Sequence, residues 1–217
     1  MTDIVSLFEN NRAWAMSKLR VDPGFFDRLT HQQNPAYLWI GCADSRVPAN
    51  EIVGLDPGEL FVHRNVANLV HPADMNCLAV LQYAIEFLQV KHVIVTGHYG
   101  CGGVRAAMQP QQLGLIDHWL RPIRDVYDKN QTDLAAIVDE YKRLNVLCEM
   151  NVREQVLNLA KTTIVQNAWH RGQELSLHGW VYGISNGLIR DLDVTLSGPD
   201  QLDKIYRIGP ATSSHSR

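Results

Sequence analysis

The chain has 217 residues, of which 46% are hydrophobic and 20% are charged. These proportions are typical of a globular protein, and the length is sufficient for one well-buried domain. The formal net charge is −3, and acidic and basic residues are mixed along the chain. This balance gives no electrostatic reason to expect nucleic acid or an anionic membrane as a partner, and we expect neither.

No targeting or membrane-spanning segment is expected. The first twenty residues lack a basic start followed by an apolar run, and no stretch approaches eighteen consecutive apolar residues. We therefore expect a cytoplasmic protein, in which a disulfide framework is not expected. Cys77 and Cys148 lie in apolar helical stretches and should be buried as small hydrophobic residues, whereas Cys42 and Cys101 have polar and glycine-rich neighbours.

The first thirty residues predict two helices. In the range 3–20, Ile4 and Phe8 fall on one helical face, and Thr2 or Asp3 can cap the helix. The Pro23-Gly24 pair ends this helix, and a short one is expected at 25–30. Residues 37–41 are short, apolar and β-prone, which predicts a buried strand.

The rest of the chain alternates strands with helices. Further strands are expected at 59–64, 92–97, 175–182 and 188–195, the last two as a hairpin turned by Ser185-Asn186-Gly187. Helices are expected at 74–88, capped by Asp74, and at about 102–108, 115–128, 133–144 and 150–170. This order predicts an α/β fold with a central, mostly parallel sheet flanked by helices, and with room for one antiparallel edge strand.

Two polar clusters follow the strands at 37–41 and 92–97, at the carboxyl ends where such sheets bind ligands. If these strands are neighbours, Cys42, His98 and Cys101 converge on one point. Two thiolates and one imidazole suit zinc, and three ligands with a free fourth position form the catalytic pattern. Asp44 is the one residue that could reach the fourth position.

The spacing alone leaves two questions open. The glycines around His98 could instead suggest a phosphate-binding loop. They lack the spacing of a dinucleotide fingerprint or a P-loop, however, and no lysine follows to neutralise a phosphate. Asp44 and Arg46 could be a surface pair worth about 0–1 kcal/mol. Alternatively, Arg46 could hold Asp44 away from zinc and leave the metal open to water.

The two clusters resemble the Cys-x-Asp-x-Arg and His-x-x-Cys signatures of the β-class carbonic anhydrases. The resemblance covers roughly residues 3–207, and the chain is similar to the bacterial members of the family. The segments that carry it are Tyr37–Pro48, Glu59–Leu69, His98–Ala107, Gly114–Asp125 and His178–Gly183. It implies a zinc lyase that reversibly hydrates carbon dioxide to bicarbonate and a proton through zinc-bound hydroxide.

The resemblance also implies the roles of individual residues. It assigns zinc to Cys42, His98 and Cys101, and it makes Asp44 and Arg46 the catalytic dyad. The implied substrate pocket consists of Gln33, Phe61, Val66, Tyr83 and Gly102, with some residues reaching in from a second subunit. Val66 and Tyr83 would equally suit a core on pattern alone.

In one bacterial subgroup of the family, bicarbonate binds away from the zinc, and Trp39, Arg64 and Tyr182 resemble that triad. A guanidinium offers paired donors to a planar oxyanion, and the indole N–H and phenol hydroxyl add more. In that subgroup the bound anion favours a closed state in which Asp44 leaves Arg46 and ligates zinc. Trp39 and Tyr182 also lie in predicted strands, where they could simply pack.

The implied organisation is a single domain. Residues 1–35 form an N-terminal helical arm, 36–207 form the zinc-binding core, and 208–217 form a tail. The family pairs subunits with the arm draped over a neighbour, so a homodimer or homotetramer is expected. Folding of the amphipathic arm onto its own domain is the alternative.

Three rival functions remain at this point. Asp44 could permanently complete a closed zinc site without catalysis. A zinc hydrolase could act on a related heteroallene such as carbon disulfide or carbonyl sulfide. A thiol-redox role has the least support, because the chain contains no Cys-x-x-Cys pair. If the chain is a hydrating enzyme, two thiolates should make the zinc-bound water less acidic than three imidazoles would, and activity should rise toward alkaline pH.

Overall fold

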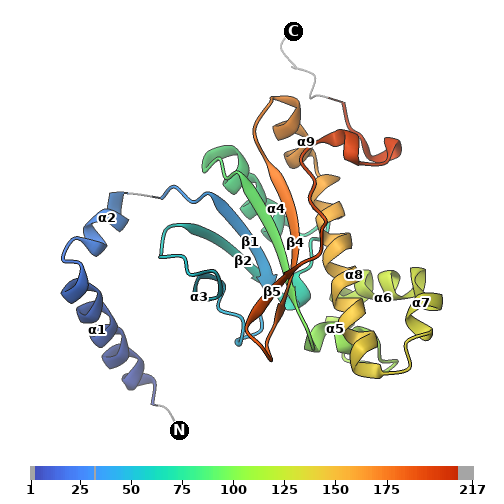
Figure 1. The fold of residues 1–217 in the computed structure, drawn as a ribbon, viewed down its shortest axis with the longest axis horizontal. Coiled ribbons are helices and arrows are strands. Elements are labelled where there is room, and N and C mark those ends of the chain that lie inside the picture. The colour runs from blue at the N-terminus through green and yellow to red at the C-terminus, as the bar shows by residue number, and fades with distance from the viewer. Residues whose placement is uncertain (1–2, 32, 210–217) are drawn as a thin grey trace. The chain divides into compact units, whose positions relative to one another are not determined.

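The computed structural model describes residues 3–31 and 33–209 (Figure 1). The chain divides into two compact units, Met1–Asn34 and Pro35–Arg217. The second unit contains the whole sheet and the helices that pack on it.

The first unit contains the two helices that the sequence predicts. They are α1 (Ile4–Val21) and α2 (Phe25–His31). The Asp3 carboxylate caps α1, whereas Thr2, the alternative cap, lies outside the described residues. No residue of α1 is buried, and apolar side chains such as Phe8 remain largely exposed.

The second unit is built on a five-stranded sheet of order β2-β1-β3-β4-β5. The strands are β1 (Tyr37–Cys42), β2 (Leu60–Asn65), β3 (His92–His98), β4 (Ser176–Gly183) and β5 (Leu188–Asp191). Neighbouring strands from β2 to β4 run parallel, and β5 pairs antiparallel with β4 as a hairpin. The predicted α/β fold and edge strand are confirmed, although β5 ends at Asp191 rather than at residue 195.

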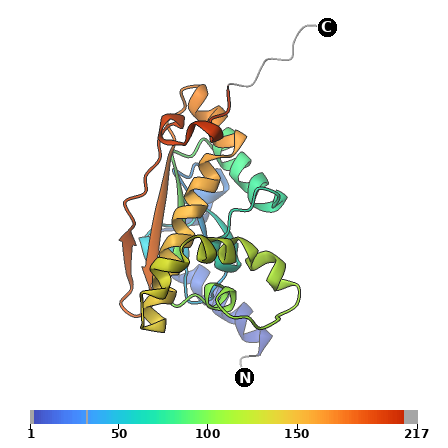
Figure 2. The ribbon, with the colours of Figure 1, turned by 90° about the vertical axis from the view of Figure 1, so that its right-hand side faces the viewer.

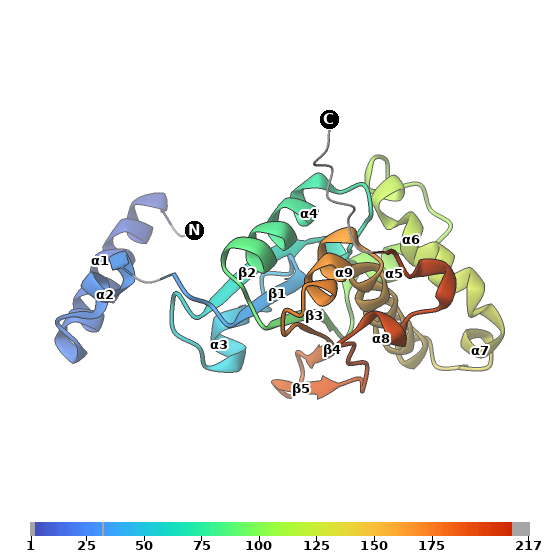
Figure 3. The same cartoon turned by 90° about the horizontal axis from the view of Figure 1, so that it is seen from above.

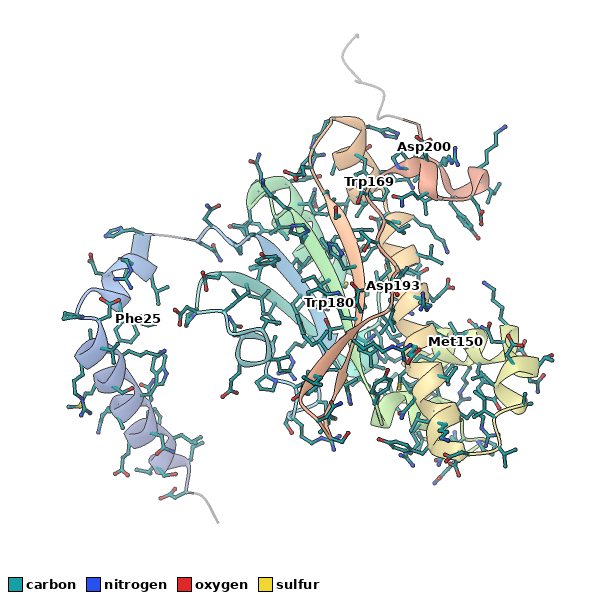
Figure 4. All side chains as sticks on the ribbon, in the orientation of Figure 1. Phe25, Met150, Trp169, Trp180, Asp193 and Asp200 are labelled. Carbon is teal, nitrogen blue, oxygen red and sulfur yellow. The ribbon has the colours of Figure 1, made fainter. Side chains whose placement is uncertain are left out.

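Helices cover the two faces of the sheet unequally (Figure 3). One face is packed by α4, its π-helical continuation η2, α8 and α9, and the opposite face by α3. Strand residues alternate between these faces, so Leu38 and Ile40 join the first cluster and Trp39 joins the other. Figure 4 labels Trp169 in the first cluster and Trp180 in the other.

The helices of this unit have the following bounds: α3 (Ala49–Val53), α4 (Met75–Gln82), η2 (Tyr83–Phe87), α5 (Gly102–Ala107), α6 (Ile116–Lys129), α7 (Gln131–Ala135), α8 (Glu140–Ala160) and α9 (Thr163–His170). Short 3₁₀ turns occur at Val66–Asn68, Pro199–Gln201 and Lys204–Tyr206. The Asp74 side chain caps α4 as predicted, accepting from the Asn76 amide at 3.0 Å. A further cluster, which includes Met150, joins α5, α6 and α7 to the first half of α8 (Figures 2 and 4).

Two predicted helices are wrong in their boundaries. The range 133–144 spans the end of α7 and the start of α8, and the range 150–170 is divided between α8 and α9. Each new helix starts at a side-chain cap. Asp139 accepts from the Lys142 amide at 3.0 Å, and Thr162 accepts from the Val165 amide at 3.2 Å. Among the described helices, none is long and apolar enough to span a bilayer.

Candidate metal centre

Three buried ligand atoms meet at the carboxyl edge of the sheet. Strand β1 ends at Cys42 and its neighbour β3 ends at His98, while Cys101 directly precedes α5. The Cys42 and Cys101 sulfur atoms are 3.9 Å apart, and the ligand atoms of all three residues lie within 4.8 Å of one another. The structure therefore brings together the three residues predicted to converge.

The histidine has the orientation of a metal ligand. His98 Nδ1 lies 3.2 Å from the Tyr99 carbonyl oxygen, so Nδ1 carries the proton and donates. This tautomer leaves a lone pair on Nε2, a buried atom without a hydrogen-bond partner among the described residues. A buried, unpartnered imidazole nitrogen beside two thiols is the donor set that zinc prefers. Cys42, His98 and Cys101 would hold the ion.

The cysteines fall into two chemical classes. The Cys101 contact, the His98 imidazole and two backbone amides lower the pKa of Cys42, while the same contact and burial raise the pKa of Cys101. Burial raises the pKa of Cys77 and of Cys148 to about 12. The last two thiols are therefore inert at neutral pH, as expected of cysteines packed as small hydrophobic residues.

A second cluster of ligand types, His63, Asp74 and Cys77, fits a metal less well. The Asn65 side chain accepts from the Leu69 amide at 2.7 Å and donates to the Leu69 carbonyl at 2.8 Å, which fixes the orientation of its amide. Its Nδ2 therefore donates to His63 Nε2 at 3.2 Å. This bond occupies one imidazole lone pair, and burial keeps Cys77 protonated.

Asp44 and Arg46 form a bidentate ion pair beside the three ligands. The Arg46 Nε and Nη2 atoms donate to Asp44 Oδ1 and Oδ2 at 2.9 and 2.7 Å, and the Arg46 amide adds a third bond at 3.0 Å. These bonds hold the pKa of the Asp44 carboxyl well below its usual range. Asp44 Oδ2 lies 3.6 Å from His98 Nε2, so the carboxylate stands next to the ligand cluster.

The structure brings only some of the residues assigned to the substrate pocket into contact with one another. Gly102 opens α5 next to Cys101, and Val66 follows β2 and remains 38% exposed. Phe61 and Tyr83 form an aromatic pair with ring centroids 5.9 Å apart, and Tyr83 is 44% exposed. Neither Val66 nor Tyr83 is therefore a core residue. Gln33 belongs to the first unit, and a shared pocket stays a prediction.

The three residues assigned to the regulatory site lie on β1, β2 and β4. Arg64 donates through Nε to the Cys42 carbonyl at 2.9 Å and through Nη2 to the Asp44 carbonyl. Trp39 is buried in the aromatic cluster on the face covered by α3, and Tyr182 packs against that cluster. Arg64 thus holds the end of β1 at Cys42 and the following loop at Asp44. Both aromatic residues also pack in the cluster on the face covered by α3.

The sequence pattern did not identify the buried amides on α8 near the centre. Asn151 and Gln155 on α8 are 1% and 0% exposed, and they bind the segment that follows β2. The available signal was an Asn and a Gln four residues apart on an otherwise apolar helix face. Buried amides need specific partners, so this spacing indicated a structured polar contact.

Comparisons with known proteins point to one family. The family model described as "Carbonic anhydrase" matches residues 37–189. A carbonic anhydrase from Emericella nidulans is 48% identical over 208 residues, covering 95% of this chain and 91% of the relative. One from Candida albicans is 31% identical and covers 93% of this chain and 71% of that protein.

Solved structures agree with this result. A tetrameric β-carbonic anhydrase from Sordaria macrospora superposes with a TM-score of 0.85 at 38% identity, over 88% of this chain and 98% of the other. A Coccomyxa β-carbonic anhydrase in complex with acetazolamide gives 0.87 at 40% identity, over 92% and 90% of the two chains.

Removal of any one ligand should empty the metal centre. We expect Cys42→Ser, His98→Ala and Cys101→Ser each to lose zinc and all hydration activity, because two remaining ligands cannot hold the ion against water and buffer. Zinc content is measured by mass spectrometry of the purified protein. Cys77→Ser and Cys148→Ser are the matched controls and should retain zinc. Full zinc occupancy in Cys101→Ser would contradict the assignment.

Proposed function

The chain belongs to the β-class carbonic anhydrases, and we propose that Asp44 and Arg46 form the catalytic pair beside zinc ligands Cys42, His98 and Cys101. The enzyme catalyses the zinc-dependent, reversible hydration of carbon dioxide to bicarbonate and a proton. The observation that carries the proposal is the bidentate pair, which places the Asp44 carboxylate 3.6 Å from His98 Nε2.

Held by Cys42, His98 and Cys101, zinc would supply a Lewis acid that lowers the pKa of a water molecule beside Asp44. Asp44 accepts a hydrogen bond from the nucleophile and so directs the oxygen lone pair toward the carbon of the substrate. Arg46 keeps this carboxylate ionised and oriented, and it acts on the substrate only through Asp44. The proton released on hydration passes to solvent or buffer.

Loss of either member of the pair should reduce turnover without releasing zinc. We expect Asp44→Asn and Arg46→Ala to retain the metal and to lose hydration activity by about 10–100-fold, the usual effect of removing a partner outside the metal ligands. Stopped-flow hydration and zinc content are measured on the same samples. Lys91→Ala, which breaks an exposed 3.0 Å pair with Glu174 at the other end of β3, should change neither. If Asp44→Asn hydrated carbon dioxide at nearly the rate of the parent, Asp44 would have no catalytic role.

We further propose that Trp39, Arg64 and Tyr182 form a regulatory bicarbonate site. Arg64 supports this role because its guanidinium donates to the backbone carbonyls of Cys42 and Asp44. An anion that engages this guanidinium competes with those carbonyls and loosens the loop that presents Asp44. Asp44 would then leave Arg46 and turn toward Cys42, His98 and Cys101, provided that bicarbonate binds this closed state more tightly.

This regulation has a distinct signature in the pH profile. Falling pH would favour the closed state, because hydroxide, which would compete with the Asp44 carboxylate for the place beside Cys42, His98 and Cys101, becomes scarcer. We expect activity to fall steeply below about pH 8 and added bicarbonate to deepen the loss. Arg64→Ala should keep zinc but relieve the bicarbonate effect, measured by stopped flow at fixed pH with chloride matching the ionic strength. An unchanged bicarbonate response in Arg64→Ala would eliminate the site.

We also propose a homo-oligomer, a dimer or tetramer, in which α1 lies on a neighbouring subunit. The helix supports this role because none of its residues is buried and because Ile4, Phe8 and Trp14 expose apolar surface. The Sordaria relative is described as tetrameric. A cytoplasmic location is proposed as well, and the four free, buried cysteines are compatible with it.

The oligomer can be tested by light scattering at micromolar concentration. We expect the full chain to elute as a dimer or tetramer, and removal of residues 1–20 should weaken association by deleting apolar contact area. The circular dichroism of the shortened chain serves as the folding control. A monomeric full chain at this concentration would refute the proposal.

A further inference from the structure

The segment that follows β2 has an unusual backbone. Ala67 and Asn68 are consecutive non-glycine residues in the left-handed region, with φ values of 64° and 51°. Left-handed conformations at such residues persist only where the surroundings determine them. Both residues are buried, so packing and hydrogen bonds within the second unit must provide that determination.

The bonds come from one face of α8. Asn151 donates to the Ala67 carbonyl at 3.0 Å, and Gln155 accepts from the Val70 amide at 2.9 Å. Gln155 also donates to the Asn151 side chain at 3.0 Å, which links the two amides to each other. Asn158 adds a bond to the Val70 carbonyl at 3.2 Å. We call these three side chains the α8 amide ladder.

The opposite side of the same segment contacts the elements that carry the metal ligands. Ala67 lies in the same buried apolar cluster as Cys42 and Cys101. The Ala67 Cβ lies 3.1 Å from where a Cβ on Gly103 would stand, and Asn68 Oδ1 lies 3.5 Å from the corresponding point on Gly97. Gly103 lies two residues after Cys101, and Gly97 immediately precedes His98. The segment therefore lies between the α8 amide ladder and the metal centre and contacts both.

We propose that Asn151 and Gln155 are positioning residues of the metal centre. They fix the segment after β2, which packs against the surroundings of Cys42 and Cys101, and they thereby slow the release of zinc. Groups outside the metal ligands hold those ligands in position, and loss of such a group typically weakens metal binding. The inference rests on the metal site proposed for Cys42, His98 and Cys101.

A matched pair of variants separates positioning from general stability. Gln155→Met removes the central amide of the ladder and keeps a similar side-chain length. Gln166→Met is the control. Gln166 is also fully buried and also binds two backbone groups, the Tyr206 carbonyl at 2.9 Å and the Ile208 amide at 2.7 Å. Both variants remove a buried amide, but only Gln155 contacts the segment beside the metal.

The primary measurement is the rate at which the zinc-loaded protein loses its metal to an excess of chelator. We expect Gln155→Met to release zinc about 10–100-fold faster than the parent, and Gln166→Met to stay within about twofold. The cobalt-substituted Gln155→Met protein should also show altered thiolate-to-cobalt and d–d absorption bands, whereas the cobalt-substituted Gln166→Met protein should keep the parent spectrum. A general loss of stability would not produce this contrast.

Equal zinc release from the two variants, with parent-like cobalt spectra, would overturn the inference and leave the ladder as a structural contact only. If Gln155→Met does not fold, Asn158→Ala removes the half-buried end of the ladder, and the same comparison with Gln166→Met decides. If the Cys101→Ser variant retained as much zinc as the parent, the metal site itself would be refuted. The two failures are therefore distinguishable.

Discussion

Cys42 and His98 meet because β1 and β3 pair in parallel, with Gly41 opposite Thr96, so that both strands end at the same edge of the sheet. The pairing is stabilised by α8, which packs closely on β3 and β4. A Cβ at Gly97 would stand 2.6 Å from the Val152 side chain, and one at Gly179 would stand 3.1 Å from it. The two glycines therefore set the depth at which α8 lies, and with it the position of the buried amides.

Charge at the centre is balanced over short distances. A second buried thiolate beside the first is costly to form without a cation, as the raised pKa of Cys101 indicates, so this donor set matches a divalent metal. The Asp44 carboxylate has a separate partner in Arg46 and therefore does not depend on the metal for its charge. Arg64 binds two backbone carbonyls of the same loop. The loop thus has two cationic anchors, and changes at either one can reach the ligands.

The backbone beside the centre is kept in a strained conformation by the rest of the fold. Each left-handed residue, Ala67 and Asn68, costs on the order of 1 kcal/mol or more. Hydrogen bonds from Asn151 and the packing of Gly103 against Ala67 offset that cost. Rigid surroundings of this kind favour one arrangement of the three ligands.

The sequence by itself determined the order of strands and helices, the α/β class and the three converging ligands, because apolar periodicity and the placement of polar clusters after strands are local properties. The division of 150–170 at Thr162 was missed because a capping threonine inside an apolar pattern is a weak signal. Only the tertiary structure decided that Asp44 pairs with Arg46, that His98 Nε2 is buried without a hydrogen-bond partner among the described residues, and that α8 amides bind the segment after β2. Each of these depends on the direction of a side chain in space or on residues more than eighty positions apart, and spacing along the chain does not fix either.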